Sequence, residues 1–153
     1  MGVVYAGFLA GSGALAVIDA RTKRLPNRIM YPLYAFGALG LTLASAVGHE
    51  WWRLIVAVLA AALLYGLFWV LWFFRGIGYG DVRLIGLIGL YMGWIGPSAV
   101  EVATLLGTLS ACVYYVGKML LRKATRKTAL AFGPYLIAGS WVALALEGVL
   151  LVR

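Results

Sequence analysis

Two aspartates in this sequence lie where a carboxyl group is costly and could therefore do chemistry. Asp19 ends the first apolar run, and Asp81 follows the segment Gly78-Tyr79-Gly80 and precedes another apolar run. At the C-terminal end of a helix the dipole disfavours a negative charge, and ionisable side chains that border hydrocarbon are usually functional. Two carboxyl groups that meet in a partly desolvated site cannot both ionise easily, so they share a proton.

A carboxyl pair of this kind is suited to the hydrolysis of a peptide bond. The ionised carboxylate can activate water as a general base, while the protonated carboxyl polarises the scissile carbonyl and stabilises the developing oxyanion. This aspartyl-protease chemistry needs no metal and no other cofactor, and we expect none. The single cysteine, Cys112, can form neither an internal disulfide nor a zinc site made of cysteines.

Each aspartate alone also has an ordinary structural interpretation. Asp19 could be a loop residue paired with Arg21 or Lys23. Asp81 could cap the helix that follows it, because Asp is a preferred N-cap residue. The glycines before Asp81 could form a plain loop, or they could let the backbone bend and hydrogen-bond to an extended substrate strand.

Membrane helices are the elements that must position these aspartates. The chain of 153 residues is 64% hydrophobic and only 12% charged, whereas soluble domains contain about 25% charged residues. Its apolar runs are Val3–Ile18, Met30–Val47, Leu54–Phe74, Leu84–Ile95, Ala99–Val116 and Ala129–Val152. Five of the runs approach the ~20 residues that a spanning helix needs. We predict an all-α, polytopic membrane bundle of about six transmembrane helices, in a single domain over residues 1–153.

Two features of the sequence bear on how these helices pack. The run Leu84–Ile95 has only 12 residues and would reach about 18 Å as a helix. Its helix must either be extended through Asp81–Arg83 or begin below the membrane surface. The pairs Gly7/Gly11 and Gly89/Gly93 have the small-xxx-small spacing of closely packed membrane helices.

The basic residues predict the orientation of the bundle. Loops one, three and five hold eleven Lys and Arg residues, and the opposite side holds two. The positive-inside rule places the basic loops in the cytoplasm and the N-terminus outside. Both aspartates then lie at the cytoplasmic ends of their helices and can meet at one depth. Since the net charge of +8 follows from this topology, we expect contact with membrane lipids and no nucleic-acid partner.

Three segments of the chain resemble motifs of the type IV prepilin peptidase family, which belongs to the GxGD intramembrane aspartyl proteases. The first segment runs from Asp19 through a basic stretch to Pro26-Asn27. The second is Gly78-Tyr79-Gly80-Asp81-Val82-Arg83-Leu84, and the third is Phe132-Gly133-Pro134-Tyr135-Leu136. The three occur in this order with this helix spacing, which makes the resemblance specific. It covers essentially the whole chain.

The resemblance implies a membrane-embedded aspartyl endopeptidase of the cytoplasmic (inner) membrane. Such an enzyme removes the short basic leader of prepilins or pseudopilins at the cytoplasmic face, and Asp19 and Asp81 carry over as the catalytic pair. Larger members have an added N-terminal region with a Cys-rich zinc motif and N-methyltransferase activity. This sequence lacks that length and those cysteines, so we expect peptidase activity without methylation. The oligomeric state stays open.

Seven further residues are expected to bind substrate or shape the site. Pro26 and Asn27 are expected to shape the turn into the second helix, and Gly133 and Pro134 to form a local kink near the start of the sixth. The full set is Gly78, Gly80, Pro26, Asn27, Arg83, Gly133 and Pro134.

Two alternative functions, of classes other than peptidase, would use the same residues. A small transporter or proton channel could use the two aspartates as relay groups, but it would need polar residues across the bilayer, and the first and fourth helices offer only Ser12. A non-catalytic subunit of a membrane assembly would need Asp81 only as a cap.

Overall fold

The computed structural model describes residues 2–22, 25–74, 77–121 and 132–151, with the side chains of 148–151 left aside. Throughout these ranges the regular elements are helices, and no strand occurs in them. The elements are α1 (Gly2–Thr22), α2 (Asn27–Gly48), α3 (Trp51–Phe73), α4 (Tyr79–Ile95), α5 (Pro97–Leu120) and α6 (Gly133–Leu151). The predicted all-α fold is confirmed, with one helix for each apolar run.

Four of these helices, α1, α2, α3 and α5, are long and apolar enough to cross a membrane. The fourth apolar run lies in α4, which begins at Tyr79 and has 17 residues. Of the two possibilities left by the sequence, the helix is therefore extended through Asp81–Arg83. At 1.5 Å per residue it is about 25 Å long, shorter than the other helices.

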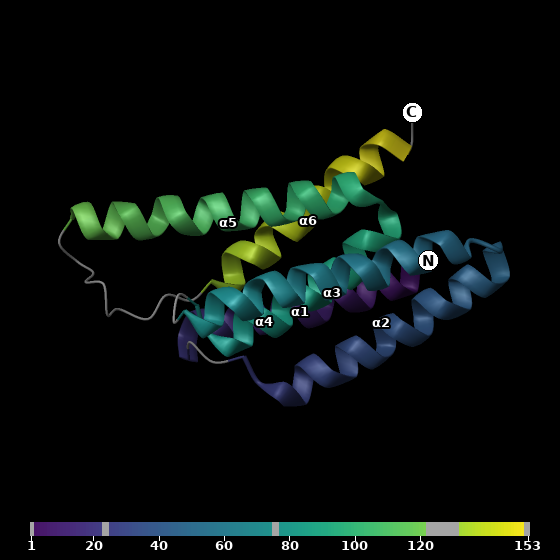
Figure 1. Cartoon of the computed structure of the whole chain (residues 1–153), viewed down its shortest axis with the longest axis horizontal. Coiled ribbons are helices and arrows are strands. Elements are labelled where there is room, and N and C mark those ends of the chain that lie inside the picture. The colour runs from purple at the N-terminus through teal and green to yellow at the C-terminus, as the bar shows by residue number, and fades with distance from the viewer. Residues whose placement is uncertain (1, 23–24, 75–76, 122–131, 152–153) are drawn as a thin grey trace.

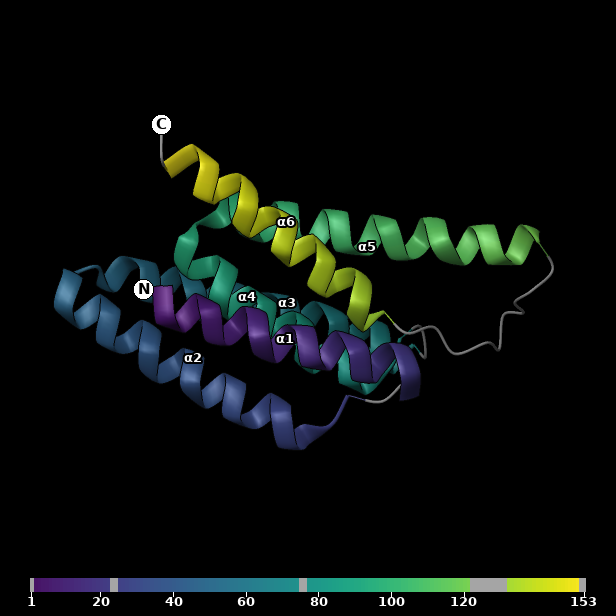
Figure 2. The same ribbon diagram turned by 180° about the vertical axis from the view of Figure 1, so that it is seen from behind.

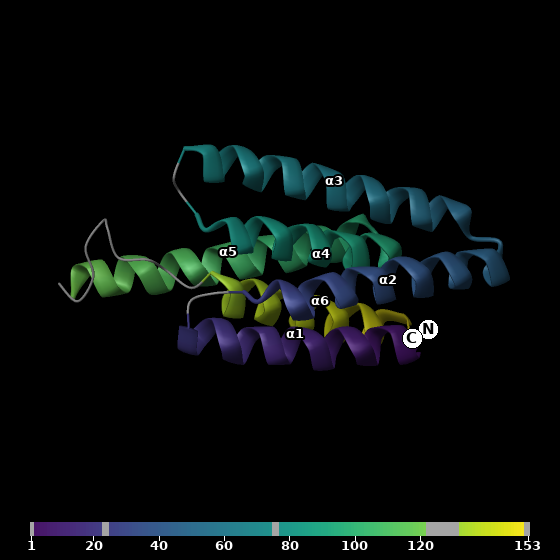
Figure 3. The same cartoon turned by 90° about the horizontal axis from the view of Figure 1, so that it is seen from below.

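The short helix α4 forms the centre of the bundle (Figures 1 and 3). Nearly every residue from Asp81 to Trp94 is buried, and α4 packs most extensively against α3. A Cβ atom added to Gly93 would lie 2.7 Å from the Cα atom of Ala57, and one added to Gly89 would lie 2.9 Å from the Cα atom of Ala61. The backbones of α3 and α4 therefore touch, as the glycine spacing predicted.

The other glycine pair of this spacing packs differently. Gly7 and Gly11 of α1 face the side chains of Phe36 and Leu33 on α2. Each glycine makes room for a large side chain there, so α1 and α2 lie against one another without the backbone contact seen between α3 and α4.

The helices α5 and α6 form a second tightly packed pair (Figure 2). A Cβ atom on Gly139 would lie 2.5 Å from the carbonyl oxygen of Ala103 and 2.5 Å from the backbone nitrogen of Gly107. The C-terminal part of α5 extends past the end of α1, whereas α6 crosses back over α1 and α4 (Figures 1 and 3). This crossing brings the start of α6 to the ends of α1 and α4 that carry the aspartates.

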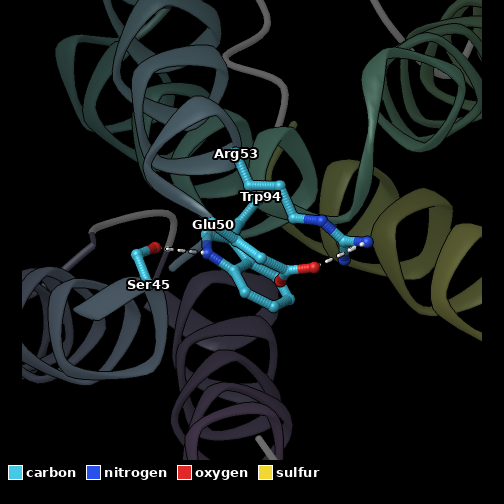
Figure 4. A network of polar contacts seen from close by, with 4 residues as sticks. All are labelled: Ser45, Glu50, Arg53 and Trp94. Carbon is cyan, nitrogen blue, oxygen red and sulfur yellow. Dashed lines mark hydrogen bonds and ion pairs between the residues drawn. The ribbon is translucent and has the colours of Figure 1, made fainter. Parts of the chain in front are cut away.

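A polar cluster joins α2, α3 and α4 at the opposite end of the bundle (Figure 4). The indole N–H of Trp94 donates a hydrogen bond of 2.9 Å to Ser45. The Arg53 guanidinium lies 5.1 Å from the centre of the Trp94 ring and pairs with Glu50 at 3.3 Å. This end of the three helices is thus fixed by specific contacts that are separate from the aspartates.

Candidate active site

Asp19 faces the interior of the bundle from the last turns of α1. The buried residues of this helix are Phe8, Ser12, Leu15 and Asp19, which fall on one face because a helix repeats every 3.6 residues. Asp19 therefore continues the stripe of α1 that packs into the core, and only 4% of it is exposed. Its Oδ2 atom is buried and has no hydrogen-bond partner among the described residues.

The interpretation of Asp19 as a loop residue paired with a neighbouring base is not supported. Arg21 is exposed, and Asp19 forms no ion pair with it. Lys23 lies outside the described residues.

Asp81 lies in the first turn of α4 with 6% of its surface exposed. The interpretation of Asp81 as the N-cap is wrong, because Gly78 occupies that position with an extended backbone (φ −76°, ψ 147°) and no side-chain cap. The Asp81 N–H donates to the Gly78 carbonyl at 3.1 Å. Two residues of helix separate Asp81 from the cap, which turns its carboxyl group toward the core.

The two carboxyl groups meet at one place in the structure. They are close enough for the Asp19 carboxylate to act electrostatically on Asp81, and the backbone of Gly133 lies within reach of both groups. Gly78 also lies beside the Asp81 carboxyl group, since a Cβ atom on Gly78 would lie 3.2 Å from Oδ2 of Asp81. Residues from α1, α4 and α6 therefore build a single buried site with two carboxyl groups.

The segment Gly133-Pro134, for which a local kink near the start of the sixth helix was predicted, forms the first two residues of α6. Proline is favoured in a first turn because its missing N–H would have no helical partner there. A Cβ atom on Gly133 would lie 2.5 Å from Oδ2 of Asp19, closer than nonbonded atoms can approach. Residue 133 must therefore lack a side chain for Asp19 to keep its position.

The connection between α1 and α2 lies against the first turn of α4. As predicted, Pro26 and Asn27 shape the entry into α2: Pro26 is the N-cap, and its carbonyl accepts hydrogen bonds of 3.2 and 3.3 Å from the next turn. The Asn27 side-chain oxygen accepts a hydrogen bond from the Arg83 guanidinium. A Cβ atom on Gly80 would lie 3.2 Å from Leu25. These contacts bring the first two motif segments together.

Four tyrosines that sequence reasoning missed surround Arg83. The guanidinium lies 4.5 Å from the centre of the Tyr79 ring and 5.6 Å from that of Tyr31. The Tyr79 hydroxyl lies 3.2 Å from that of Tyr65, and the Tyr34 hydroxyl donates to the Arg83 carbonyl at 2.6 Å. The spacing of Tyr31 and Tyr34, three apart and soon after the Pro-Asn segment, was the available signal, since such residues share a helix face.

Comparisons with known proteins agree with these motifs. The model of the type IV leader peptidase family matches residues 6–117. The chain is 33% identical over 138 residues to the prepilin leader peptidase/N-methyltransferase of Aeromonas salmonicida, which covers 86% of this chain and 45% of that protein. The protein of the same name from Escherichia coli is 32% identical over 135 residues, covering 84% and 56%. The one from Pseudomonas putida is 35% identical over 142 residues, covering 85% and 45%.

The chain spans 45% to 56% of the length of these relatives. No solved structure matches it significantly. The family match extends over most of the chain and includes both aspartates, Pro26-Asn27 and the Gly78–Asp81 segment. This protein therefore belongs to the type IV leader peptidase family.

Proposed function

We propose that this protein is a membrane-embedded aspartyl endopeptidase. It removes the basic leader of type IV prepilins or related pilin-like precursors at the cytoplasmic face of the inner membrane. The observation that carries the proposal is the meeting of two buried aspartates from α1 and α4 at the start of α6. The names of the relatives, prepilin leader peptidase/N-methyltransferase, support the substrate class. We propose only the peptidase activity for this chain.

The pair would hydrolyse the peptide bond in two steps. In the first, the water oxygen bonds to the scissile carbonyl carbon, the ionised carboxylate takes a proton from the water, and the protonated carboxyl gives its proton to the carbonyl oxygen. In the second, the C–N bond breaks as the nitrogen takes the proton that came from water. One hydroxyl of the diol returns a proton to the other carboxylate, which restores the starting pair.

The surroundings of the two carboxyl groups suit this chemistry. Both side chains are almost fully buried, and burial of two acids together favours a shared proton. The unpartnered Oδ2 atom of Asp19 is free to bond to water or to the substrate carbonyl. These features support Asp19 and Asp81 as the catalytic pair.

The relay function finds less support in the structure. A proton path needs polar groups that continue through the bundle. On α4 the residues from Leu84 to Trp94 are buried and are mainly aliphatic or glycine. On α1, the Ser12 hydroxyl donates to the Leu9 carbonyl and accepts from Trp141, so it already has partners.

The decisive experiment replaces each aspartate singly, as Asp19→Asn and Asp81→Asn. The substrate is a precursor with a basic leader, a glycine and then an apolar helix, reconstituted with the enzyme in lipid nanodiscs. Because each carboxyl acts as acid or base in turn, each variant should cleave roughly 100-fold more slowly or worse. The matched control is Glu101→Gln, which changes an exposed acid on α5 and should cleave normally.

Membrane insertion of each variant is measured alongside cleavage. Near-normal cleavage by either aspartate variant would refute the catalytic pair. Loss of proton-driven flux in the same variants, with cleavage unaffected, would instead favour the relay function.

A further inference from the structure

We propose that the peptide N–H of Gly133 is a shared hydrogen-bond donor that positions both carboxyl groups of the site. The first turn of α6 thereby becomes the third element of the catalytic machinery, beside α1 and α4. This inference rests on the proposed function, and it concerns a residue beyond the stretch 6–117 that the family model matches.

The first observation is the position of Gly133 between the two acids. Its backbone lies within reach of the carboxyl groups of both Asp19 and Asp81. Gly133 is itself buried, and its Cα hydrogens face the Asp19 carboxyl so closely that a Cβ atom would lie 2.5 Å from Oδ2 and 3.1 Å from Cγ. The backbone of one residue thus lies beside both side chains.

The second observation concerns which N–H groups the first turn of α6 has to offer. The first N–H groups of any helix lack partners within the helix. Here the N–H groups of Tyr135 and Leu136 both donate to the Phe132 carbonyl, each at 3.2 Å. Pro134 has no N–H. Gly133 therefore holds the free donor of this turn, and its backbone lies beside the carboxyl pair.

The third observation concerns the Asp19 carboxyl group. The Oδ2 atom of Asp19 is buried without a hydrogen-bond partner among the described residues. A buried carboxylate oxygen without a partner is costly, so this carboxyl depends on the few donors near it. A helix N-terminus also carries partial positive charge, which favours an anion beside it. The single N–H between two acids can both offset their repulsion and fix their separation.

Contacts elsewhere in α6 fix the place of this donor. The backbone contact at Gly139 holds α6 closely against α5. The Trp141 indole N–H donates to Ser12 of α1 at 3.0 Å, and Ser12 lies on the same helix face as Asp19. The start of α6 is therefore held in register with the end of α1.

The sharpest test removes this N–H and adds no atom. Cell-free translation with glycolic acid at position 133 converts the Phe132–Gly133 amide into an ester. Because the lost bond is a hydrogen bond to a charged group, kcat should fall roughly 10- to 100-fold. The KM should stay unchanged, since the N–H does not touch the substrate. The control is lactic acid at Ala99, which makes an ester in the first turn of α5 at the opposite end of the bundle.

A misfolded fraction of the ester enzyme would also lower the measured kcat, so it must be accounted for. The kcat is therefore expressed per substrate-binding site, counted with a precursor whose scissile amide is N-methylated and cannot be cleaved. A structural defect lowers the number of sites, whereas loss of the positioning donor lowers the turnover of each site. Parental kcat per site in the ester enzyme would overturn the inference.

A second variant, Gly133→Ala, keeps the N–H and adds a methyl group against Asp19. It should lower kcat per site by about 100-fold, as displacement of an acid–base group does. Gly117→Ala is the control, because a Cβ atom there meets nothing within 4 Å. If Asp19→Asn abolishes cleavage while both changes at 133 leave it intact, this inference fails and the proposed function stands. If Asp19→Asn cleaves normally, the proposed function itself fails.

Discussion

Arg83 is the residue that joins the two motif segments on which the site is built. Its guanidinium donates to Asn27 at the start of α2 and lies over the ring of Tyr79 in its own helix. Asn27 follows Asp19 by a short connection, and Arg83 follows Asp81 by two positions. The hydrogen bond between them therefore ties the α1–α2 connection to the first turn of α4.

A double-mutant cycle with Asn27→Ala and Arg83→Gln measures this link. Each single change should slow cleavage about 5-fold, and the double variant should be no slower than either single one, because both remove the same partly exposed bond. Cleavage rates of the four proteins give the coupling. Arg53→Gln is the matched control, since Arg53 also lies over an aromatic ring but at the opposite end of the bundle. Simple multiplication of the two single effects would show that the residues act independently.

Residue-level prediction could name candidates where a chemical pattern was specific, and it failed where only the three-dimensional surroundings decide. The aspartates could be picked out because carboxyl groups beside hydrocarbon are rare. The prediction of Asp81 as an N-cap was wrong because residue preference alone cannot fix which residue caps a helix, and Gly78 caps this one. The role of Gly133 beside Asp19 depends on a contact between distant helices, which no local pattern shows.

At the scale of elements, the contact between α3 and α4 is the largest in the bundle. It depends on glycines because lipid offers little hydrophobic drive for helices to associate, and close packing must supply the attraction instead. Gly93 lies against the backbone of Ala57, where no side chain can move aside. Since α4 carries Asp81, this contact also holds one half of the site.

Gly93→Ala should therefore destabilise the bundle by about 1–3 kcal/mol, the usual cost of overpacking. Tryptophan fluorescence during thermal unfolding in detergent would report a lower midpoint for this variant. Gly66→Ala on α3 is the control, because a Cβ atom there has nothing within 4 Å, and its midpoint should match the parent. Equal midpoints for both variants would mean that the helix backbones are farther apart than the structure places them.

The existence of the helices could be predicted, but which helix packs on which could not. Apolar runs of the right length are a strong signal, and each one became a helix. In lipid, however, the outer face of a helix is as apolar as the inner face. Leu63 of α3 is exposed whereas Leu87 of α4 is fully buried, and nothing in their identity separates them. The central place of α4 and the crossing of α6 over α1 therefore needed the structure.

At the scale of the whole molecule, the fold places the aspartates at the end of the bundle where the basic residues gather. The helices alternate in direction, so α1 ends, α4 begins and α6 begins at the same end (Figures 1 and 2). The C-terminal part of α5, with Lys118, extends past that end (Figure 3). From the positive-inside rule we predict that this is the cytoplasmic end, the face at which the proposed function requires a leader to be cleaved.

Cysteine labelling of the intact membrane tests this orientation. In a Cys112→Ser background, the single changes His49→Cys and Lys23→Cys place a thiol near the ends of α2 and α1 that the rule assigns to opposite faces. A membrane-impermeant maleimide added outside should label position 49 and spare position 23 until the membrane is opened. Because the label reads topology and not activity, inactive Asp19→Asn protein should give the same pattern. Labelling of position 23 from outside would put the aspartates on the wrong face, and a cytoplasmic leader could not reach them.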